Sequence, residues 1–205
     1  MRVKTLAVGL LEANAHILWD PTSKEAVVVD CGGDADRIEA FLATKELKAK
    51  YIVLTHGHVD HIAGASDLKR LTGAQIVIHE QDAEMTEDPH KNASRQFPIP
   101  PVSFKADVLV KDADILMLGE AELKIVHTPG HTKGGICIVA GEYIATGDTL
   151  FKGSIGRTDL YGGDMNALRK SLVKLADLPH RLIVLSGHGG QSTIRDEVRS
   201  NPYMR

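Results

Sequence analysis

Short apolar runs separated by turn residues occupy the first eighty positions of the chain. This pattern predicts strands over residues 3–8, 15–19, 26–29, 51–54 and 75–79. The runs at 26–29 and 51–54 are continuous, which is typical of strands buried on both faces. Apolar residues at helical spacing predict a helix over 34–47, capped by Asp34, and another over 61–71, ended by Gly73. Alternating strands and helices indicate helices layered on a sheet.

Residues 84–106 interrupt this pattern. A stretch of this length without predicted elements is typical of a lid or binding loop. Its apolar side chains Phe97, Ile99 and Phe104 could wall a substrate pocket, with ordinary core packing as the alternative. Beyond it we predict strands over 115–118, 122–127, 135–140, 143–146 and 182–185, and a helix over 165–176. Both halves mix strands and helices, so we expect one domain over residues 1–205 that contains two sheets.

Composition narrows the function classes. The chain has 205 residues, 43% hydrophobic and 25% charged, with a formal net charge of −3. It is long enough to bury a core, and the lack of a basic surplus disfavours nucleic-acid binding. No apolar run approaches the roughly 20 residues of a membrane span. The two cysteines, Cys31 and Cys137, lie far apart, so we expect no disulfide and a cytoplasmic location.

The most informative polar cluster follows the predicted strand at 51–54. In Thr55-His56-Gly57-His58-Val59-Asp60-His61, four ligand-type side chains fall within six residues. In a tight turn, His56 and His58 can point to one metal ion while Asp60 and His61 point to its neighbour. Imidazole and carboxylate together suit Zn, Fe or Mn. A solvated polar turn is the alternative, but one turn rarely needs so many ligand-type residues.

Other polar clusters also follow predicted strands. His131 follows the Pro129-Gly130 turn and is the expected ligand there, whereas we assign His127 to packing. Asp148 has two oxygens and could bridge two ions. The candidate metal ligands are therefore His56, His58, Asp60, His61, His131, Asp148 and His188. Two divalent ions, zinc with iron or manganese as alternatives, would lower the pKa of a shared water. Asp30 and Thr55 are candidates for hydrogen-bonding the ligating imidazoles.

The remaining histidines show no ligand spacing, and we expect structural or surface roles for them. They are His16, His79, His90, His127 and His180. We likewise expect Cys31 to be a buried, inert thiol.

These residues, in this order and spacing, resemble the metallo-β-lactamase superfamily. The stretches 127–135, 147–151 and 153–159 resemble more narrowly its glyoxalase II-type branch. The resemblance implies an α+β fold, a four-layer αβ/βα sandwich in which two mixed β-sheets are flanked by helices. It also implies a site at the edge that the two sheets share.

In activity, the resemblance implies a binuclear metal-dependent hydrolase, a thioesterase of the hydroxyacylglutathione hydrolase type. A metal-bridging hydroxide would attack a small-molecule thioester, and Asp60 would take its proton as the catalytic residue. We expect no C-terminal helical glutathione-binding domain, because the chain stops at Arg205. Arg157 stands where that enzyme has a lysine for glutathione and is the candidate substrate-binding residue, but Asp159 replaces a tyrosine. A thiol carrier other than glutathione therefore stays open.

Two alternatives use the same residues. Persulfide dioxygenases look similar and hold one iron through two histidines and one aspartate, here His56, His131 and Asp148. Another hydrolase of the same superfamily, such as a lactonase, a β-lactamase-like enzyme or a phosphodiester hydrolase, is the other alternative. The ligands alone therefore do not separate hydrolysis from oxygenation.

Overall fold

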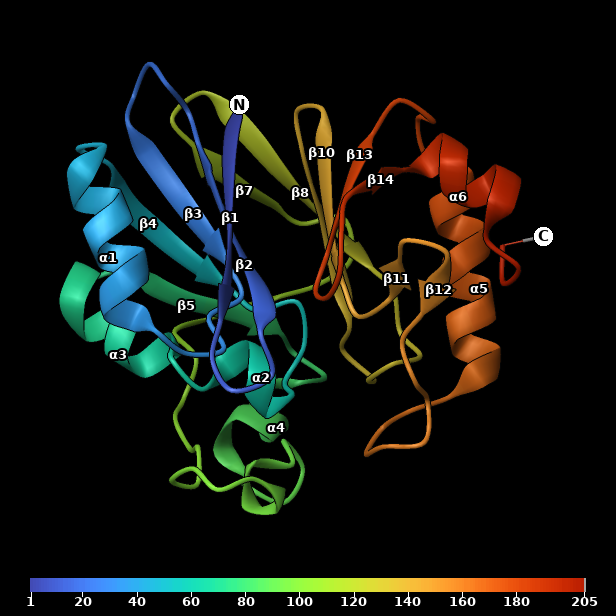
Figure 1. The fold of residues 1–205 in the computed structure, drawn as a ribbon, viewed down its shortest axis with the longest axis horizontal. Helices are drawn as coiled ribbons and strands as arrows, with labels where there is room; N and C mark the ends of the chain where they lie inside the picture. Colours follow the sequence, from blue (N-terminus) through green and yellow to red (C-terminus); the bar gives the residue numbers. More distant parts are fainter. Residues whose placement is uncertain (205) are drawn as a thin grey trace.

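Two six-stranded sheets face each other, and helices cover the outer face of each (Figure 1). The computed structural model describes residues 1–204. The first sheet has the strand order β1-β2-β3-β4-β5-β6. Its strands are β1 (Arg2–Val8), β2 (Ala13–Trp19), β3 (Glu25–Val29), β4 (Lys48–Val53), β5 (Gln75–His79) and β6 (Val108–Val110). The first two pairs are antiparallel and the other three are parallel, so the sheet is mixed.

The second sheet is also mixed and has the order β14-β13-β10-β9-β8-β7. Its strands are β7 (Ile115–Leu118), β8 (Ala121–His127), β9 (Ile136–Ala140), β10 (Tyr143–Gly147), β13 (Ile183–Ser186) and β14 (Ser192–Thr193). A small hairpin of β11 (Leu150–Phe151) and β12 (Ser154–Ile155) follows β10. Helices α1 (Ala35–Thr44) and α3 (Ala65–Thr72) cover the first sheet, whereas α5 (Met165–Ala176) and α6 (Ile194–Ser200) cover the second. The predicted four-layer αβ/βα sandwich is confirmed.

Alternate residues of the central strands enter different core layers. In β3, Ala26 and Val28 pack towards the helices α1 and α3, while Val27 and Val29 pack between the two sheets. A third layer joins the second sheet to α5 and α6 and contains Leu168 and Val184. Side chains of a strand alternate between its two faces. A strand buried on both faces must therefore be continuously apolar, as the runs at 26–29 and 51–54 are.

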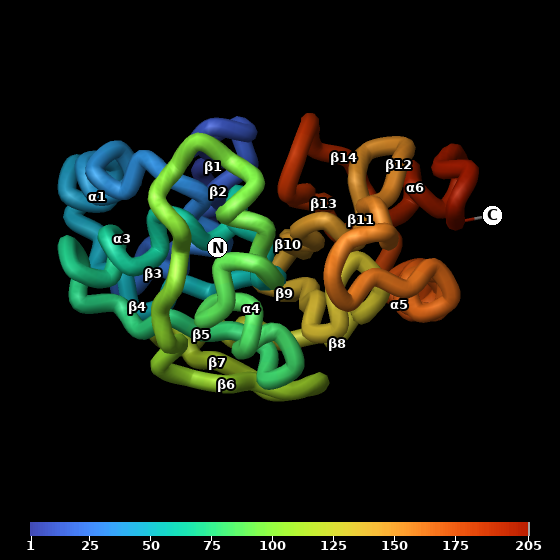
Figure 2. Tube along the Cα trace, turned by 90° about the horizontal axis from the view of Figure 1, so that it is seen from below, coloured from blue at the N-terminus to red at the C-terminus, as the bar shows by residue number. Residues whose placement is uncertain are grey.

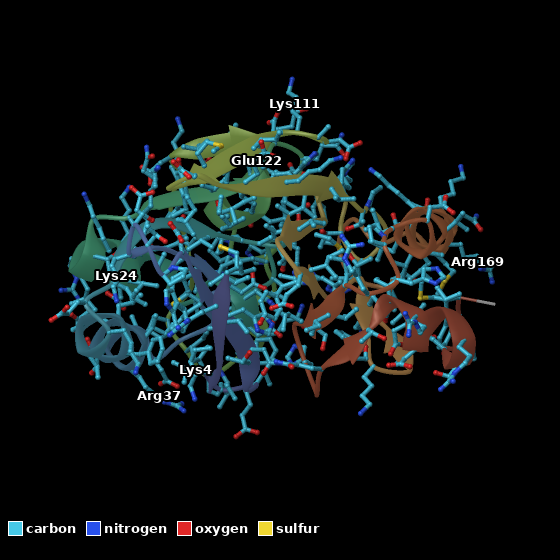
Figure 3. All side chains as sticks on the ribbon, turned by 90° about the horizontal axis from the view of Figure 1, so that it is seen from above. Lys4, Lys24, Arg37, Lys111, Glu122 and Arg169 are labelled. Atoms are coloured by element: carbon cyan, nitrogen blue, oxygen red, sulfur yellow. The ribbon has the colours of Figure 1, made fainter. Side chains whose placement is uncertain are left out.

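Charged side chains lie at the periphery of these layers. Lys111, Arg37 and Arg169 project from the edges of the molecule in Figure 3. No helix among residues 1–204 is both long and apolar enough to cross a membrane.

The helix predicted over 61–71 is wrong in its extent. It is divided into α2 (Val59–Ile62) and α3, which begins at Ala65. The division lies at Gly64, whose backbone N–H donates to the carbonyl of Cys31 at 2.8 Å. A Cβ at Gly64 would lie 2.8 Å from the Cys31 sulfur, so the chain passes here too closely for any larger residue.

The stretch at 84–106 is a folded segment rather than an open loop. It begins within α4 (Ala83–Glu87) and contains a 3₁₀ turn over Ser94–Gln96. The buried amide of Asn92 organises it, because its nitrogen donates to the carbonyls of Met85 and Val102, both at 2.9 Å. Asn92 also accepts, through its own carbonyl, the backbone N–H of Val59 in α2 at 2.9 Å. The segment is thus attached to the helix that carries Asp60.

Several short elements were not predicted at all: β6, β14, the β11–β12 hairpin and α6. Each is short, and β6 pairs with β5 only because the folded segment returns the chain to the sheet edge. The first helix also ends at Thr44, earlier than predicted, and Asp34 does not cap it through its side chain. Instead, the Asp34 carboxylate accepts the backbone N–H of Gly9 at 3.1 Å.

His16 links the two sheets. It lies on β2, is 2% exposed, and its Nε2 donates to the carbonyl of Ser186 at the end of β13, at 3.0 Å. Nδ1 therefore accepts from the Thr5 hydroxyl at 2.9 Å. This is the structural role expected for His16. Burial lowers the pKa of His16 to about 4, so its imidazole is neutral in the folded protein at neutral pH.

This depressed pKa predicts acid lability. Between pH 6.5 and about 4 the unfolded chain binds a proton at His16 that the folded chain does not, so stability falls as the pH falls. The loss amounts to about 3 kcal/mol at pH 4. Replacing His16→Gln, which keeps one donor and one acceptor, is expected to flatten this part of the profile. Chemical denaturation of the metal-free protein across this range measures it, with exposed His180→Gln as control. Equal slopes in wild type and H16Q would contradict this assignment.

Candidate metal centre

Four loops meet at one rim of the sandwich, and each follows a strand. Residues 55–61 follow β4, residues 128–134 follow β8, Asp148 follows β10, and His188 follows β13. In the second sheet, β8, β10 and β13 run in the same direction, so their carboxyl ends share an edge. Side chains placed at such ends are held by rigid strands but approach one another through loops.

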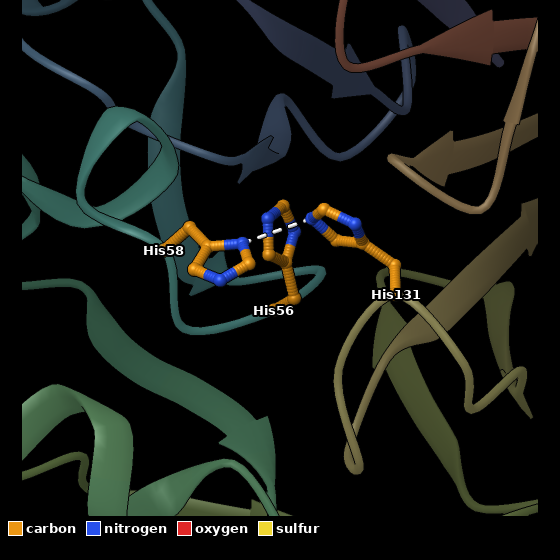
Figure 4. Close-up of side chains that lie close together, drawn as sticks. All are labelled: His56, His58 and His131. Atoms are coloured by element: carbon orange, nitrogen blue, oxygen red, sulfur yellow. Dashed lines mark hydrogen bonds between the residues drawn. The ribbon is translucent and has the colours of Figure 1, made fainter. Parts of the chain in front are cut away.

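The structure brings all seven predicted ligands together. Three overlapping groups have ligand atoms within 4.8 Å of one another. They are His56, His58 and His131; His56, His61 and Asp148; and Asp60, His61 and His188. Figure 4 shows the first group, in which His58 Nδ1 lies 2.9 Å from His131 Nε2. We call these seven side chains the His/Asp cluster.

Asp148 lies between the two ends of the His/Asp cluster. Its Oδ1 is 3.3 Å from His61 Nε2, and its Oδ2 is 3.6 Å from His131 Nε2. At one end, Asp60 Oδ2 is 3.2 Å from His188 Nε2 and 3.6 Å from His61 Nε2. Asp148 Oδ2 is also 3.9 Å from His188 Nε2, so this carboxylate lies close to imidazoles of both ends, as a bridging carboxylate must.

Hydrogen bonds outside the cluster set the tautomers of three imidazoles. His56 Nδ1 lies 3.0 Å from the Thr55 hydroxyl oxygen, and His61 Nδ1 lies 2.8 Å from Asp30 Oδ2. His131 Nδ1 donates to the carbonyl of Arg157 at 2.7 Å. With Nδ1 donating in each ring, Nε2 keeps its lone pair and turns it towards the cluster. Imidazoles held in this way are metal ligands oriented by their neighbours.

Asp30 binds three donors at once. It accepts the backbone N–H of Thr55 at 2.7 Å, the Thr55 hydroxyl at 2.8 Å and His61 Nδ1. Because the Thr55 hydroxyl donates to Asp30, its oxygen is free to accept from His56. The predicted partners Asp30 and Thr55 thus orient one imidazole in each half of the cluster.

Unpartnered buried atoms support cation binding at this place. Among residues 1–204, the buried side-chain atoms without a hydrogen-bond partner are His56 Nε2, His58 Nε2, His61 Nε2, Asp148 Oδ1 and Ser192 Oγ. Four of these five belong to the cluster. Orphaned buried polar atoms are costly, so several in one place indicate a bound group. Imidazole nitrogens and carboxylate oxygens are a donor set that fits a divalent transition-metal ion.

Burial and charge set the protonation of the cluster. Burial, together with the neighbouring imidazoles, lowers the pKa of His56 well below its usual range and that of His58 to about 3. Burial also opposes the charged form of His61, but Asp148 and the other nearby carboxylates outweigh it and raise the pKa of His61. Burial would raise the pKa of Asp60, yet His61 and His188 hold it below its usual value. The carboxylate is therefore ionised at neutral pH.

Two supporting residues were missed in the sequence. Gly187 precedes His188, and a Cβ there would collide with Asp148 Oδ1 and lie 2.6 Å from His61 Cε1, so only glycine fits. Asn14 at the start of β2 donates through its side-chain amide to the carbonyls of Ser186 and Gly189, both at 3.0 Å. It therefore holds the loop that carries His188. Glycines on both sides of His188 are a local signal of close backbone approach to the site, but no local pattern marks Asn14.

Other predicted residues lie outside the cluster. His127 stacks on His79, with ring centroids 4.0 Å apart. Cys31 is buried, and burial raises the pKa of its thiol to about 12, as expected for an inert thiol. The exposed guanidinium of Arg157 forms two hydrogen bonds to Asp159, at 2.7 and 2.6 Å. Its charge is therefore paired, while its carbonyl orients His131.

Comparison with known proteins agrees with this geometry. Residues 8–188 match the model of the metallo-beta-lactamase superfamily. The chain belongs to this superfamily. It is 36% identical to a protein named hydroxyacylglutathione hydrolase GloC from Haemophilus influenzae, with 100% of this chain and 98% of that protein covered.

Two solved structures of this superfamily fold are similar over nearly their whole length. BLEG-1, a B3 metallo-beta-lactamase, has a TM-score of 0.93 and 35% identity, with 99% of both chains covered. TTHA1623 in a di-iron-bound form has a TM-score of 0.86 and 29% identity, covering 98% of this chain and 99% of that one. Membership of the superfamily and the His/Asp cluster together make this chain a metal-dependent hydrolase of the metallo-β-lactamase fold.

The Asp30 contacts predict a metal-binding defect on substitution. In Asp30→Asn, the amide presents a donor to at least one of the N–H or O–H groups that the carboxylate accepts. We expect metal affinity to fall about 10- to 100-fold, as for other partners of ligating histidines. Competition with a chelator measures this, and the exposed Asp36→Asn is the matched control. Unchanged affinity in D30N would remove Asp30 from the support of the cluster.

Proposed function

We propose that this protein is a binuclear thioester hydrolase of the hydroxyacylglutathione hydrolase type. The observation that carries the proposal is the position of Asp148, whose carboxylate lies within 3.9 Å of imidazoles from both ends of the His/Asp cluster. One ion would be held by His56, His58 and His131, and the other by Asp60, His61 and His188. The similarity to GloC along the full chain supports a thioester as the substrate class.

Two divalent ions bound here would lower the pKa of a shared water and polarise the substrate carbonyl, as in other two-metal hydrolases. The protein supplies the remaining functions. Asp60 is ionised, 3.2 Å from His188 and partly open to solvent, so it can accept a hydrogen bond from the attacking water and then its proton. The imidazoles whose Nδ1 atoms are hydrogen-bonded keep fixed positions beside the carboxylates of Asp60 and Asp148.

The leaving group distinguishes thioesters from amides. A thiolate, with a reference pKa of about 8.5, departs without protonation. Asp60 and Asp148 are held ionised by nearby imidazoles. The imidazoles of the cluster would themselves bind metal, so a leaving amine would depend for its proton on Asp60 alone, whereas a thiolate needs none. This chemistry favours a thiol leaving group over the amine of a β-lactam or a peptide.

A β-lactam hydrolase is the second candidate, because BLEG-1 has nearly the same fold over its whole length. Hydrolysis of a chromogenic cephalosporin with little thiol release would favour it. Oxygen uptake by iron-loaded protein with glutathione persulfide would instead indicate the dioxygenase alternative, with iron at His56, His131 and Asp148.

The test is thiol release from S-lactoylglutathione by metal-replete protein without oxygen. We expect release by the wild type and a loss of about 10²- to 10⁴-fold in kcat for Asp60→Asn, since Asp60 receives a proton. The exposed Asp36→Asn should behave as wild type. Metal content is measured on every variant, so that a change in chemistry is separated from a change in occupancy. Near-normal kcat in D60N would remove Asp60 from the reaction.

A further inference from the structure

A cavity of about 470 Å³ opens beside Asp60. One wall is the tip of the β1–β2 hairpin, with Leu10 and Leu11. The opposite wall is the end of the folded segment, with Phe97 and Ile99. Figure 2 shows this light-green segment passing the hairpin when the molecule is seen from below. Phe104 also lines the cavity, but it packs against the core under the helices as well.

The charges around this cavity are of one sign. Asp34, Asp60 and Asp67 line it, and among the residues that the structure describes no lysine, arginine or histidine does. Arg37 lies 4.0 Å from Asp34 and Arg70 lies 3.4 Å from Asp67, but both pairs are exposed and contribute little. The cavity therefore disfavours carboxylates and phosphates. Lys133 lies two residues after His131 in the chain, and the backbone carbonyl of Arg157 accepts from His131, so these two basic residues adjoin the other half of the cluster.

We propose that this cavity binds the acyl group of the thioester, and that this group is uncharged and apolar. The proposal rests on the proposed thioesterase function. With the carbonyl at the His/Asp cluster, the acyl chain enters between Leu10 and Ile99, and the thiol leaves on the side of His131. Exposed apolar side chains at the mouth of a cavity gain most from an apolar ligand that removes them from water.

The test is a thioester series on one neutral thiol, N-acetylcysteamine, with acetyl, hexanoyl, phenylacetyl and succinyl groups. We expect kcat/KM to be highest for hexanoyl or phenylacetyl and lowest for succinyl. In Phe97→Ala and Ile99→Ala, kcat/KM for hexanoyl should fall about 10-fold or more, while that for acetyl stays within about threefold. Asp67→Lys should raise kcat/KM for the succinyl thioester, because it replaces a negative charge at the cavity with a positive one. Exposed Ile115→Ala on β7 is the control for Ile99→Ala.

The outcomes separate the two proposals. Hydrolysis that is indifferent to the acyl group, or equal loss for acetyl and hexanoyl in F97A and I99A, overturns the acyl cavity and leaves the thioesterase standing. If no thioester is hydrolysed, the proposed function fails. Calorimetry of hexanoate and succinate binding to metal-loaded protein then tests whether the cavity binds apolar ligands. Tighter binding of hexanoate that is lost in I99A supports an apolar ligand site, and equal binding overturns it.

A second observation is independent of the cavity. Asp82, just before α4, is fully buried and accepts hydrogen bonds from both loops that carry the first ligand group. Its Oδ2 accepts the Gly57 N–H at 3.2 Å and the Thr132 hydroxyl at 2.6 Å, and its Oδ1 accepts the Gly134 N–H at 2.6 Å. A Cβ at Gly134 would lie 2.5 Å from the Asp82 backbone nitrogen, so the loop of residues 128–134 packs directly against Asp82.

We infer that Asp82 is a positioning residue for the group of His56, His58 and His131. Gly57 lies between His56 and His58, and Thr132 follows His131 in the chain. One carboxylate thus fixes the distance between the two loops, and with it the approach of His58 to His131. Within residues 1–204, the side-chain hydrogen bonds of Asp82 go to these two loops, whereas His61 in the other half is held by Asp30.

The test measures cobalt affinity for one half of the cluster at a time. His188→Asn disables the second group, and His58→Asn disables the first. In the H188N background, Asp82→Asn and Thr132→Val should weaken cobalt binding about 10-fold or more. In the H58N background, the same changes should leave it within about threefold. Thr132→Val removes one hydrogen bond and keeps the buried carboxylate. It therefore tests the same contact even if D82N does not fold. Equal weakening in both backgrounds, or none in either, overturns the inference.

Discussion

The whole site depends on burying polar groups that find their partners across two sheets. Asp30 is the clearest case: it is 1% exposed, and its carboxylate satisfies three donors from residues 55 and 61. Its backbone has φ of 62°, a conformation that aspartate tolerates better than most residues. A buried charge is stable only when it is paired and hydrogen-bonded. The tight turn after β3 is therefore shaped around the carboxylate.

Two buried carboxylates, Asp30 and Asp82, support different parts of the cluster. Asp30 holds His61 and, through Thr55, His56, whereas Asp82 joins the loops of His58 and His131. Both carboxylates follow buried parallel strands of the first sheet. The second sheet supplies His131, Asp148 and His188 from its own strand ends. The apolar layer between the sheets brings these two sets within hydrogen-bonding distance, so core packing determines ligand geometry.

Much of this was predictable because it is encoded locally. The continuous apolar runs identified the central strands, and β5 and α5 have the predicted limits. Ligand-type residues after strands identified the seven members of the cluster. The division of the helix at Gly64, the pairing of β6 and the contacts of Asn92 depend on distant residues, and no local pattern contains them. Asp82 also follows a strand, but a single aspartate in the sequence gives no indication that it accepts hydrogen bonds from three distant residues.

The hydrogen bond from the Val59 N–H to the Asn92 carbonyl has a thermodynamic consequence. It connects the folded segment, whose end forms one wall of the cavity, to the residue next to Asp60. If ordering of the wall and occupation of the His/Asp cluster favour the same state of α2, each binding event strengthens the other by the same factor, because such coupling is reciprocal. The metal content of a preparation would then alter the apparent affinity of ligands that never touch the ions.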